Sequence, residues 1–141
     1  MLDIEKYIKE SKDKVICVYN KIDDLNKEAE GVMYFQGHMF KFLSGRYGKG
    51  YAPIGKYRAF RLIEEEREAF KQFDLGWQTP LEAKFPTNRS GLALHPDGNK
   101  KGTLGCIGLD FESIDENVLC HNLLRDFFEN KPILNVEIIK G

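Results

Sequence analysis

The feature that most constrains the fold is a series of short runs rich in β-branched and aromatic residues, separated by Gly, Pro and polar residues. These runs are VICVY at 15–19, VMYFQGHMFKFLSG at 32–45, KYRAFRLI at 56–63, GLALH at 91–95 and ILNVEII at 133–139. Apolar runs of about four to eight residues between turn signals are typical of β-strands. The run at 32–45 predicts two short strands, or one strand bulged at Gly37. We therefore expect a chain rich in β-structure.

One segment has helical periodicity instead. In SIDENVLCHNLLRDFFEN, at 113–130, apolar residues recur at helical intervals, and Pro132 follows the end of the segment. Ser113 and Glu116 have the spacing of a capping box, which predicts the N-terminus of a helix. A short helix is expected over 2–10, and 64–73 is a further helical candidate. Together these elements predict an α+β fold, mainly β: a single mixed β-sandwich-like domain with one packed C-terminal helix.

The chain is predicted to form one domain over residues 1–141. This length is enough to bury a core without disulfides or metals, and the sequence has no repeat, low-complexity run or linker. Residues 1–31 are assigned to the core because they contain VICVY. The segment 74–90 contains Gly and Pro and predicts a long excursion that packs over the domain through Trp77.

Composition argues against several partners. Lys and Arg total 21 against 22 for Asp and Glu, so no positive field attracts nucleic acid or an anionic membrane. No stretch approaches the roughly 20 apolar residues of a membrane span. The first residues, MLDIEKYIKESKDK, are charged throughout and lack the apolar region and cleavage site of a signal peptide. We expect a monomer that needs no nucleic acid, membrane or cofactor.

The three cysteines differ in their surroundings. They cannot all pair within one chain and none is in a CxxC arrangement, so reduced thiols are the simplest interpretation. Cys17 lies in an apolar run and Cys120 in the predicted helix, where a thiol is usually a small buried hydrophobe. Cys106 instead lies between small residues. No metal site is predicted, because HPDGN at 95–99 lacks a second ligand at a suitable spacing.

The stretch LHPDGNKKGTLGCIG, at 94–108, is the strongest candidate for a site. A free thiol has a pKa of about 8.5 and needs a partner to act as a nucleophile at neutral pH, and histidine is the best such partner. His95 and Cys106 are joined by a loop whose glycines allow it to double back. The alternative is an ordinary strand-end histidine and a buried thiol.

The backbone around Cys106 offers candidates for an oxyanion hole. Gly105 and Gly108 leave this backbone open, and the N–H groups of Leu104 and Gly105, in the same loop as Thr103, are candidate donors. Such a donor contributes roughly 3 to 4 kcal/mol to a transition state in known cases.

Four motifs, in order, resemble the catalytic domain of the L,D-transpeptidase (YkuD-like) family. They are Ser44-Gly45, PIGKY at 53–57, Leu94-His95 and TLGCI at 103–107, within residues 32–111. The family has a strand ending in Ser-Gly, a Thr-Pro-x-Gly-x-Tyr segment, a strand-end histidine and a Ser/Thr-x-Gly-Cys-hydrophobic motif. This chain differs from the family at Gly108, where Arg or Asn is usual, and at Leu104, where His is usual. Fewer residues also separate its histidine from its cysteine. These differences resemble compact variants among bacterial peptidoglycan-targeting effectors.

The resemblance implies a mixed sheet cradling one helix and a cysteine acyl-enzyme that acts on peptidoglycan tetrapeptide stems. Cys106 would attack the carbonyl before the terminal D-Ala, and His95 would move the proton from the thiol to the departing amine. The acyl group then passes to an amine or to water. The outcome is L,D-transpeptidation, D-amino acid exchange or L,D-carboxypeptidase action.

The same resemblance suggests residues that contact substrate. Arg89 or Lys101 would grip a substrate carboxylate in place of the missing motif arginine. Asp97 and Asn99 are candidates for contacting substrate. They are also candidates for orienting the imidazole, a task that a backbone carbonyl often performs in the family. Trp77 is expected to wall the groove, with a plain core position as the alternative.

Two other functions stay open from the sequence. One is a catalytically silent module of the same fold that binds a peptide or glycan, and the other is a cytosolic cysteine acyltransferase or hydrolase with a different substrate. A wall enzyme without a signal peptide would be a mature form, or would be delivered by a phage or a secretion machine, with an immunity protein as a further candidate partner.

Overall fold

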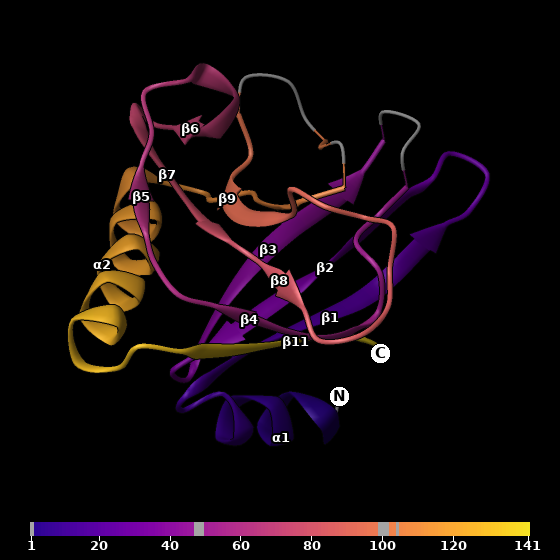
Figure 1. Cartoon of the computed structure of the whole chain (residues 1–141), viewed down its shortest axis with the longest axis horizontal. Coiled ribbons are helices and arrows are strands. Elements are labelled where there is room, and N and C mark those ends of the chain that lie inside the picture. The colour runs from indigo at the N-terminus through magenta and orange to yellow at the C-terminus, as the bar shows by residue number, and fades with distance from the viewer. Residues whose placement is uncertain (1, 47–49, 99–101, 104) are drawn as a thin grey trace.

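The computed structural model describes residues 2–46, 50–98, 102–103 and 105–141, and in them one curled mixed sheet wraps around the core (Figure 1). In chain order the elements are α1 (Leu2–Glu10), β1 (Lys14–Asp23), β2 (Glu28–Phe35), β3 (His38–Gly45), β4 (Gly55–Ala59), β5 (Ile63–Glu64), the short 3-10 helix η1 (Glu68–Phe70), β6 (Lys71–Gln72), β7 (Leu75–Pro80), β8 (Glu82–Ala83), β9 (Ala93–Pro96), β10 (Ile107–Leu109), α2 (Ile114–Asn130) and β11 (Leu134–Lys140). The predicted α+β class, with strands dominant and one long helix near the C-terminus, is confirmed.

The strand order explains the curl of the sheet. The path is β5-β7-β9-β10-β3-β2-β1-β11-β4-β8, with β6 paired to β7. Within it β1 and β11 run parallel, as do β9 and β10, while β2 and β3 form the antiparallel hairpin expected around Gly37. Only Leu81 separates β7 from β8, although these strands lie near opposite ends of the path. The sheet therefore has to bend round on itself.

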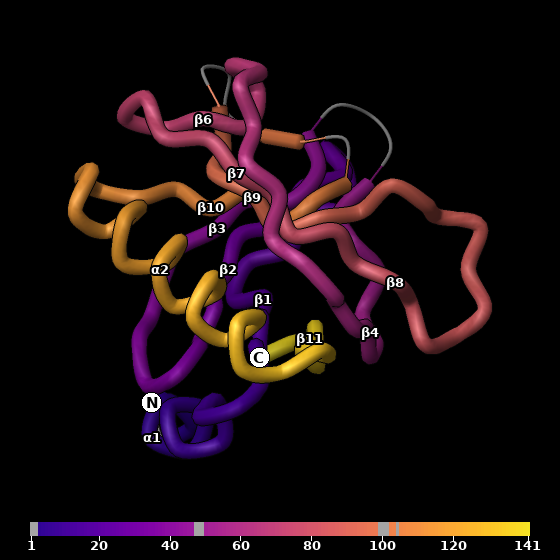
Figure 2. The backbone as a smooth tube through the Cα atoms, turned by 60° about the vertical axis from the view of Figure 1, so that its left-hand side comes forward, coloured from indigo at the N-terminus to yellow at the C-terminus, as the bar shows by residue number. Residues whose placement is uncertain are grey.

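Residues 15–19 of β1 are buried on both faces, which accounts for their unbroken apolar run. Alternate residues of β1, including Val15 and Cys17, pack into the main core against β11, β3 and α2. The intervening residues Ile16 and Val18 face a smaller cluster completed by Tyr7 and other residues. Figure 2 shows α1 and α2 on different sides of the sheet. The prediction that residues 1–31 contribute to the core is consistent with this burial, since the β1 run is almost fully inaccessible to solvent.

Helix α2 begins where its capping residues predict. The Ser113 Oγ accepts a hydrogen bond from the Glu116 N–H at 3.2 Å. One turn further on, the buried Asn117 side chain joins the helix to the sheet. Its amide donates to the carbonyl oxygens of Gln72 (2.8 Å) and Leu75 (3.1 Å) and accepts from another side chain described below.

Two predictions for the middle of the chain are wrong. Residues 64–73 form β5, η1 and β6 rather than a helix, because their backbone pairs with β7. Residues 74–90 are not a continuous excursion, since they supply β7 and β8 to the sheet. The residues of β7 include a Gly and a terminal Pro, which is why its sequence resembles a loop. Tertiary pairing outweighs these local signals.

Replacing Asn117 with Ala should destabilise the domain by about 2–5 kcal/mol, because buried polar partners on β6 and β7 lose their hydrogen bonds. Urea unfolding monitored by tryptophan fluorescence measures the change. Asn122→Ala, at a half-buried position of the same helix, is the matched control and should cost less than about 1 kcal/mol. Equal losses in the two variants would contradict a structural role for this amide.

Candidate active site

His95 lies near the end of β9, between β7 and β10 in the sheet. All residues of this strand are buried, and His95 is 5% exposed. A strand buried on both faces has to be nearly continuous in apolar residues, as the run from Leu92 to Leu94 is. The strand thereby places a polar imidazole in a part of the molecule that is buried from solvent.

The imidazole of His95 has a fixed orientation. Its Nδ1 lies 2.6 Å from the carbonyl oxygen of Pro96. A carbonyl oxygen can only accept, so Nδ1 carries the proton and Nε2 holds the free lone pair. Burial lowers the pKa of His95 from 6.5 to about 4, against smaller opposing effects of the Pro96 hydrogen bond and the Glu65 carboxylate. The ring is neutral at pH 7 and offers Nε2 as a base.

The segment between β5 and β7 covers the imidazole. The Phe70 ring meets His95 edge-on, with centroids 4.5 Å apart, and the Arg67 guanidinium lies 4.4 Å above the Phe70 ring. Arg67 is in turn hydrogen bonded to Glu65, whose carboxylate also accepts from Gln78. Sequence reasoning missed these residues, because no motif links them to His95 and only the pairing of β5 and β6 with β7 brings them there.

Cys106 lies immediately before β10, the strand that pairs with β9, which carries His95. In the parallel pairing of β9 with β10, Gly108 is opposite His95 and Ile107 is opposite Leu94. Side chains of paired residues project to the same face, so Gly108 shares a face with His95. Cys106 lies two residues before Gly108, in a bend outside the strand, so the register places the loop of the predicted nucleophile next to the strand of the predicted base.

The Cys106 thiol is partly exposed and uncharged at rest. Its Sγ donates a weak hydrogen bond to the Gly91 carbonyl oxygen at 3.6 Å, and among the described residues no hydrogen bond joins it to His95. Burial raises the thiol pKa, while a backbone hydrogen bond with Ala93 and the charge of Arg89 lower it by less. The resting pair is therefore a neutral thiol and a neutral imidazole.

Thr103 organises the loop before the thiol. Its Oγ1 donates to the Cys106 carbonyl oxygen at 2.8 Å and accepts from the N–H groups of Gly105 and Gly45, each at 3.1 Å. The Thr103 N–H donates to the Gly45 carbonyl oxygen at 2.7 Å. The Gly105 N–H, a predicted oxyanion donor, thus holds the loop together, and the Ser-Gly motif at the end of β3 anchors it.

Arg89 packs against the same loop. Its Nη1 donates to the Tyr51 carbonyl oxygen and its Nη2 to that of Gly50, both at 3.2 Å. Gly105 has a φ of +118°, and a Cβ at this position would overlap the guanidinium. Glycine is therefore needed at 105 both for its backbone conformation and for the approach of the arginine.

Gly108 occupies a position with no room for a side chain. A Cβ there would lie 2.7 Å from the Thr103 methyl group and 3.2 Å from the Asp97 Cβ. Asp97 is buried, and its Oδ2 accepts from the Gly102 N–H at 3.0 Å, so it closes the loop between β9 and β10. The family arginine or asparagine has no space here, because Thr103 and Asp97 fill it.

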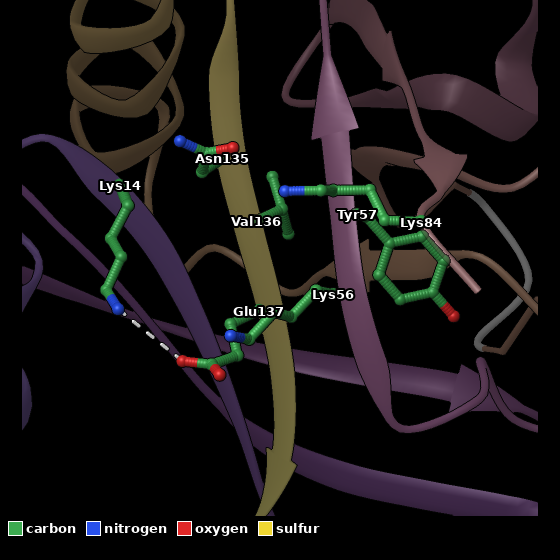
Figure 3. Close-up of a pocket in the computed structure, with 7 residues that line it drawn as sticks. All are labelled: Lys14, Lys56, Tyr57, Lys84, Asn135, Val136 and Glu137. Atoms are coloured by element: carbon green, nitrogen blue, oxygen red, sulfur yellow. Dashed lines mark ion pairs between the residues drawn. The ribbon is translucent and has the colours of Figure 1, made fainter.

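A groove of about 360 Å³ lies between β8 and the segment before β9, and its lining residues do not include His95 or Cys106. Its lining includes Gly91, whose carbonyl contacts Sγ, together with Arg89, Arg61, Phe60 and Leu81. The groove combines apolar side chains with two guanidinium groups. Another concavity, shown in Figure 3, lies over β11 and contains neither His95 nor Cys106.

The remaining predicted residues lie either in the core or outside the described residues. Trp77 is fully buried in β7 and its Nε1 donates to the Asn117 Oδ1 at 2.8 Å, so it is a core residue and does not wall the groove. Leu104, Asn99 and Lys101 lie outside the described residues.

The other two cysteines lie in the core. Cys17 and Cys120 are fully buried, and burial raises the pKa of each thiol. Among the residues that the structure describes, no group of three His, Cys, Asp or Glu side chains is placed to hold a metal ion. None of the described helices is long and apolar enough to cross a membrane.

Comparison with known proteins gives a likeness of fold. No family model matches the chain, and no curated protein does. The crystal structure of the helical cell shape determining protein Pgp2 from Campylobacter jejuni matches over 98% of this chain and 55% of its own, with 16% sequence identity and a TM-score of 0.50. A mutant of Pgp2 matches over the same shares with a TM-score of 0.44. This chain spans just over half the length of Pgp2.

Acidification should destabilise the domain through His95. Because its pKa falls from 6.5 to about 4 on folding, only the unfolded state gains this proton between these two values. Stability from this group is full above pH 6.5, and up to about 3 kcal/mol is lost as the pH falls to about 4. Urea unfolding across this range should show a shallower dependence for His95→Gln than for the parent. The exposed His38→Gln control should leave the dependence unchanged; a parent-like slope in His95→Gln would contradict the assignment.

Proposed function

We propose that this chain is a cysteine acyltransferase or peptidase of the L,D-transpeptidase type that acts on peptidoglycan tetrapeptide stems. The observation that supports the proposal is the β9–β10 register, which sets Gly108, two residues after Cys106, opposite His95. The Pgp2 likeness supports it, since that protein determines cell shape and its fold covers nearly all of this chain. The four-motif resemblance adds the substrate class.

The neutral resting pair favours general-base catalysis over a preformed ion pair. As Sγ attacks the substrate carbonyl carbon, its proton moves to Nε2 of His95, whose Nδ1 stays bound to the Pro96 carbonyl. A C–S bond forms, the C–N bond to the terminal D-amino acid breaks, and Nε2 returns the proton to the departing amine. An amine or water then attacks the thioester, and Cys106 recovers its proton through the same imidazole.

The thiol has to turn from the Gly91 carbonyl toward the imidazole for this step. Its present hydrogen bond is long and weak, so the cost of the rotation is small. Catalytic hydrogen bonds are often loose without substrate and tighten when substrate binds. The groove at Gly91 is proposed to hold the stem peptide, and the exposed Arg61 guanidinium in its lining suits a substrate with free carboxylates.

The decisive experiment is digestion of purified muropeptides followed by mass spectrometry. The parent should remove or exchange the terminal D-Ala of tetrapeptide stems, and Cys106→Ala and His95→Gln should each reduce the rate by at least about a hundredfold, as losses of a nucleophile or general base do. Cys17→Ala, which removes a buried thiol, is the matched cysteine control and should stay active. Loss of D-Ala in the Cys106→Ala variant would contradict the proposal.

Arg89 is proposed to position the nucleophile loop. Arg89→Met should cost about 1–2 kcal/mol of stability, because two carbonyl groups lose a charged donor. It should also move the pH–rate profile of Cys106 alkylation by iodoacetamide to higher pH, because the Arg89 charge lowers the thiol pKa. Arg89→Lys should restore part of this shift.

Arg61→Met supplies the control, because Arg61 lines the same groove from an exposed position. It should leave the alkylation profile in place. If Arg89→Met lost stability but kept the alkylation pH–rate profile of the parent, Arg89 would have a structural role only, which would contradict the positioning role.

A catalytically silent binding module is the second candidate. The absence of a described Sγ–imidazole hydrogen bond and the raised thiol pKa favour it. Such a module would retain muropeptide affinity in Cys106→Ala and would show no turnover in the digestion described above.

A further inference from the structure

The outward face of the sheet at β1, β11 and β4 carries a cluster of basic side chains that the proposed function does not use. We call it the lysine cradle. It consists of Lys14, Lys56, Lys84, Asn135 and Glu137, which line a cavity of about 240 Å³ together with Tyr57 and Val136. Figure 3 shows Lys56 and Lys84 extending over β11 from one side and Lys14 reaching it from the other.

Strand register fixes the bases of these side chains. Lys14 is opposite Asn135 across the parallel β1–β11 pair, and Glu137 is opposite Lys56 across the antiparallel β11–β4 pair. The Lys84 N–H donates to the Lys56 carbonyl oxygen at 2.8 Å, which holds the two stems side by side. Paired residues of a sheet project to the same face, so the polar ends of all five side chains gather over β11.

The charges in the cradle do not balance. Three ammonium groups meet one carboxylate, that of Glu137, which lies 3.5 Å from the Lys14 Nζ. Among the described residues Lys56 and Lys84 have no ion pair. Arg58, one row along β4, has Glu82 at 3.2 Å, and Lys41 and Arg46 elsewhere on the sheet have acids within reach. The cradle therefore has a local excess of two positive charges in a chain whose net charge is −1.

The donor set selects the kind of anion. Lysine ammonium groups act as compact point charges that approach from separate directions, and lysine is a recurrent phosphate ligand of this kind. Asn135 adds an amide N–H donor beside them. A tetrahedral oxyanion has several charged oxygens that can accept from separate donors at the same time.

We propose that the lysine cradle binds a phosphoryl oxyanion, held by Lys56 and Lys84 with Asn135 as hydrogen-bond donor. The site lies on β11 and β4, apart from the groove beside Cys106, and does not depend on the reaction proposed there. A single phosphate group and a phosphate chain present the same chemistry, so both belong to the proposed ligand class.

Titration with inorganic phosphate, followed by amide chemical shifts, tests the proposal. Saturable shifts should appear in β4, β11 and at residue 84, and sodium chloride at the same ionic strength should not reproduce them. The double variant Lys56→Gln/Lys84→Gln should raise the Kd by about tenfold or more, because two charge-assisted contacts are lost. Sodium polyphosphate is the second arm: tighter binding than phosphate indicates a chain as the ligand, and equal binding indicates a single group.

The matched control is Lys6→Gln/Lys9→Gln on α1, which removes the same charge from exposed positions that do not line the cradle. It should leave the Kd unchanged. Shifts that do not saturate, an equal effect of acetate, or equal weakening in the two double variants would overturn the proposal. Both variants alter exposed side chains, so the fold should persist in each.

Discussion

The parallel pairing of β9 with β10 is the contact on which the candidate site depends. It sets Gly108, two residues after Cys106, beside His95. A shift of one residue would turn His95 and Gly108 to opposite faces of the sheet. Side-chain hydrogen bonds also hold the register. The Thr103 hydroxyl joins the loop before β10 to Gly45 of β3, and the Asp97 carboxylate, just after β9, accepts from the Gly102 N–H in that loop. The chemistry proposed for the thiol thus depends on ordinary strand pairing.

Burial determines the electrostatic state of the pair. It raises the thiol pKa and lowers that of the imidazole, so both groups are neutral when no substrate is bound. Arg89 partly opposes this effect at Cys106 through its charge. A neutral imidazole with its proton fixed on Nδ1 is suited to accept a proton at Nε2. The same burial lowers the free energy of unfolding at acid pH, because a protonated imidazole would be a charged group without hydration.

Steric contacts explain why Gly108 stands where the resembled motif usually has Arg or Asn. Thr103 and Asp97 fill the space that a side chain at 108 would need. Arg89, from a segment before β9, brings a guanidinium to the nucleophile loop, where its hydrogen bonds go to the Gly50 and Tyr51 carbonyl oxygens. Sequence position alone suggested Arg89 as a substrate ligand; the contacts support a role in holding the loop.

The sequence by itself determined the strands with clear apolar runs, helix α2 with its Ser113 cap, and the candidate pair His95 and Cys106, because these depend on local periodicity and short motifs. Tertiary pairing alone explains why β5, η1 and β6 replace a helix at 64–73, why β7 forms over 75–80, why Trp77 is a core residue, and why Phe70 covers the imidazole. It also decided where the lysines of the cradle gather. These features arise from pairing between segments far apart in the chain, which local propensity does not encode.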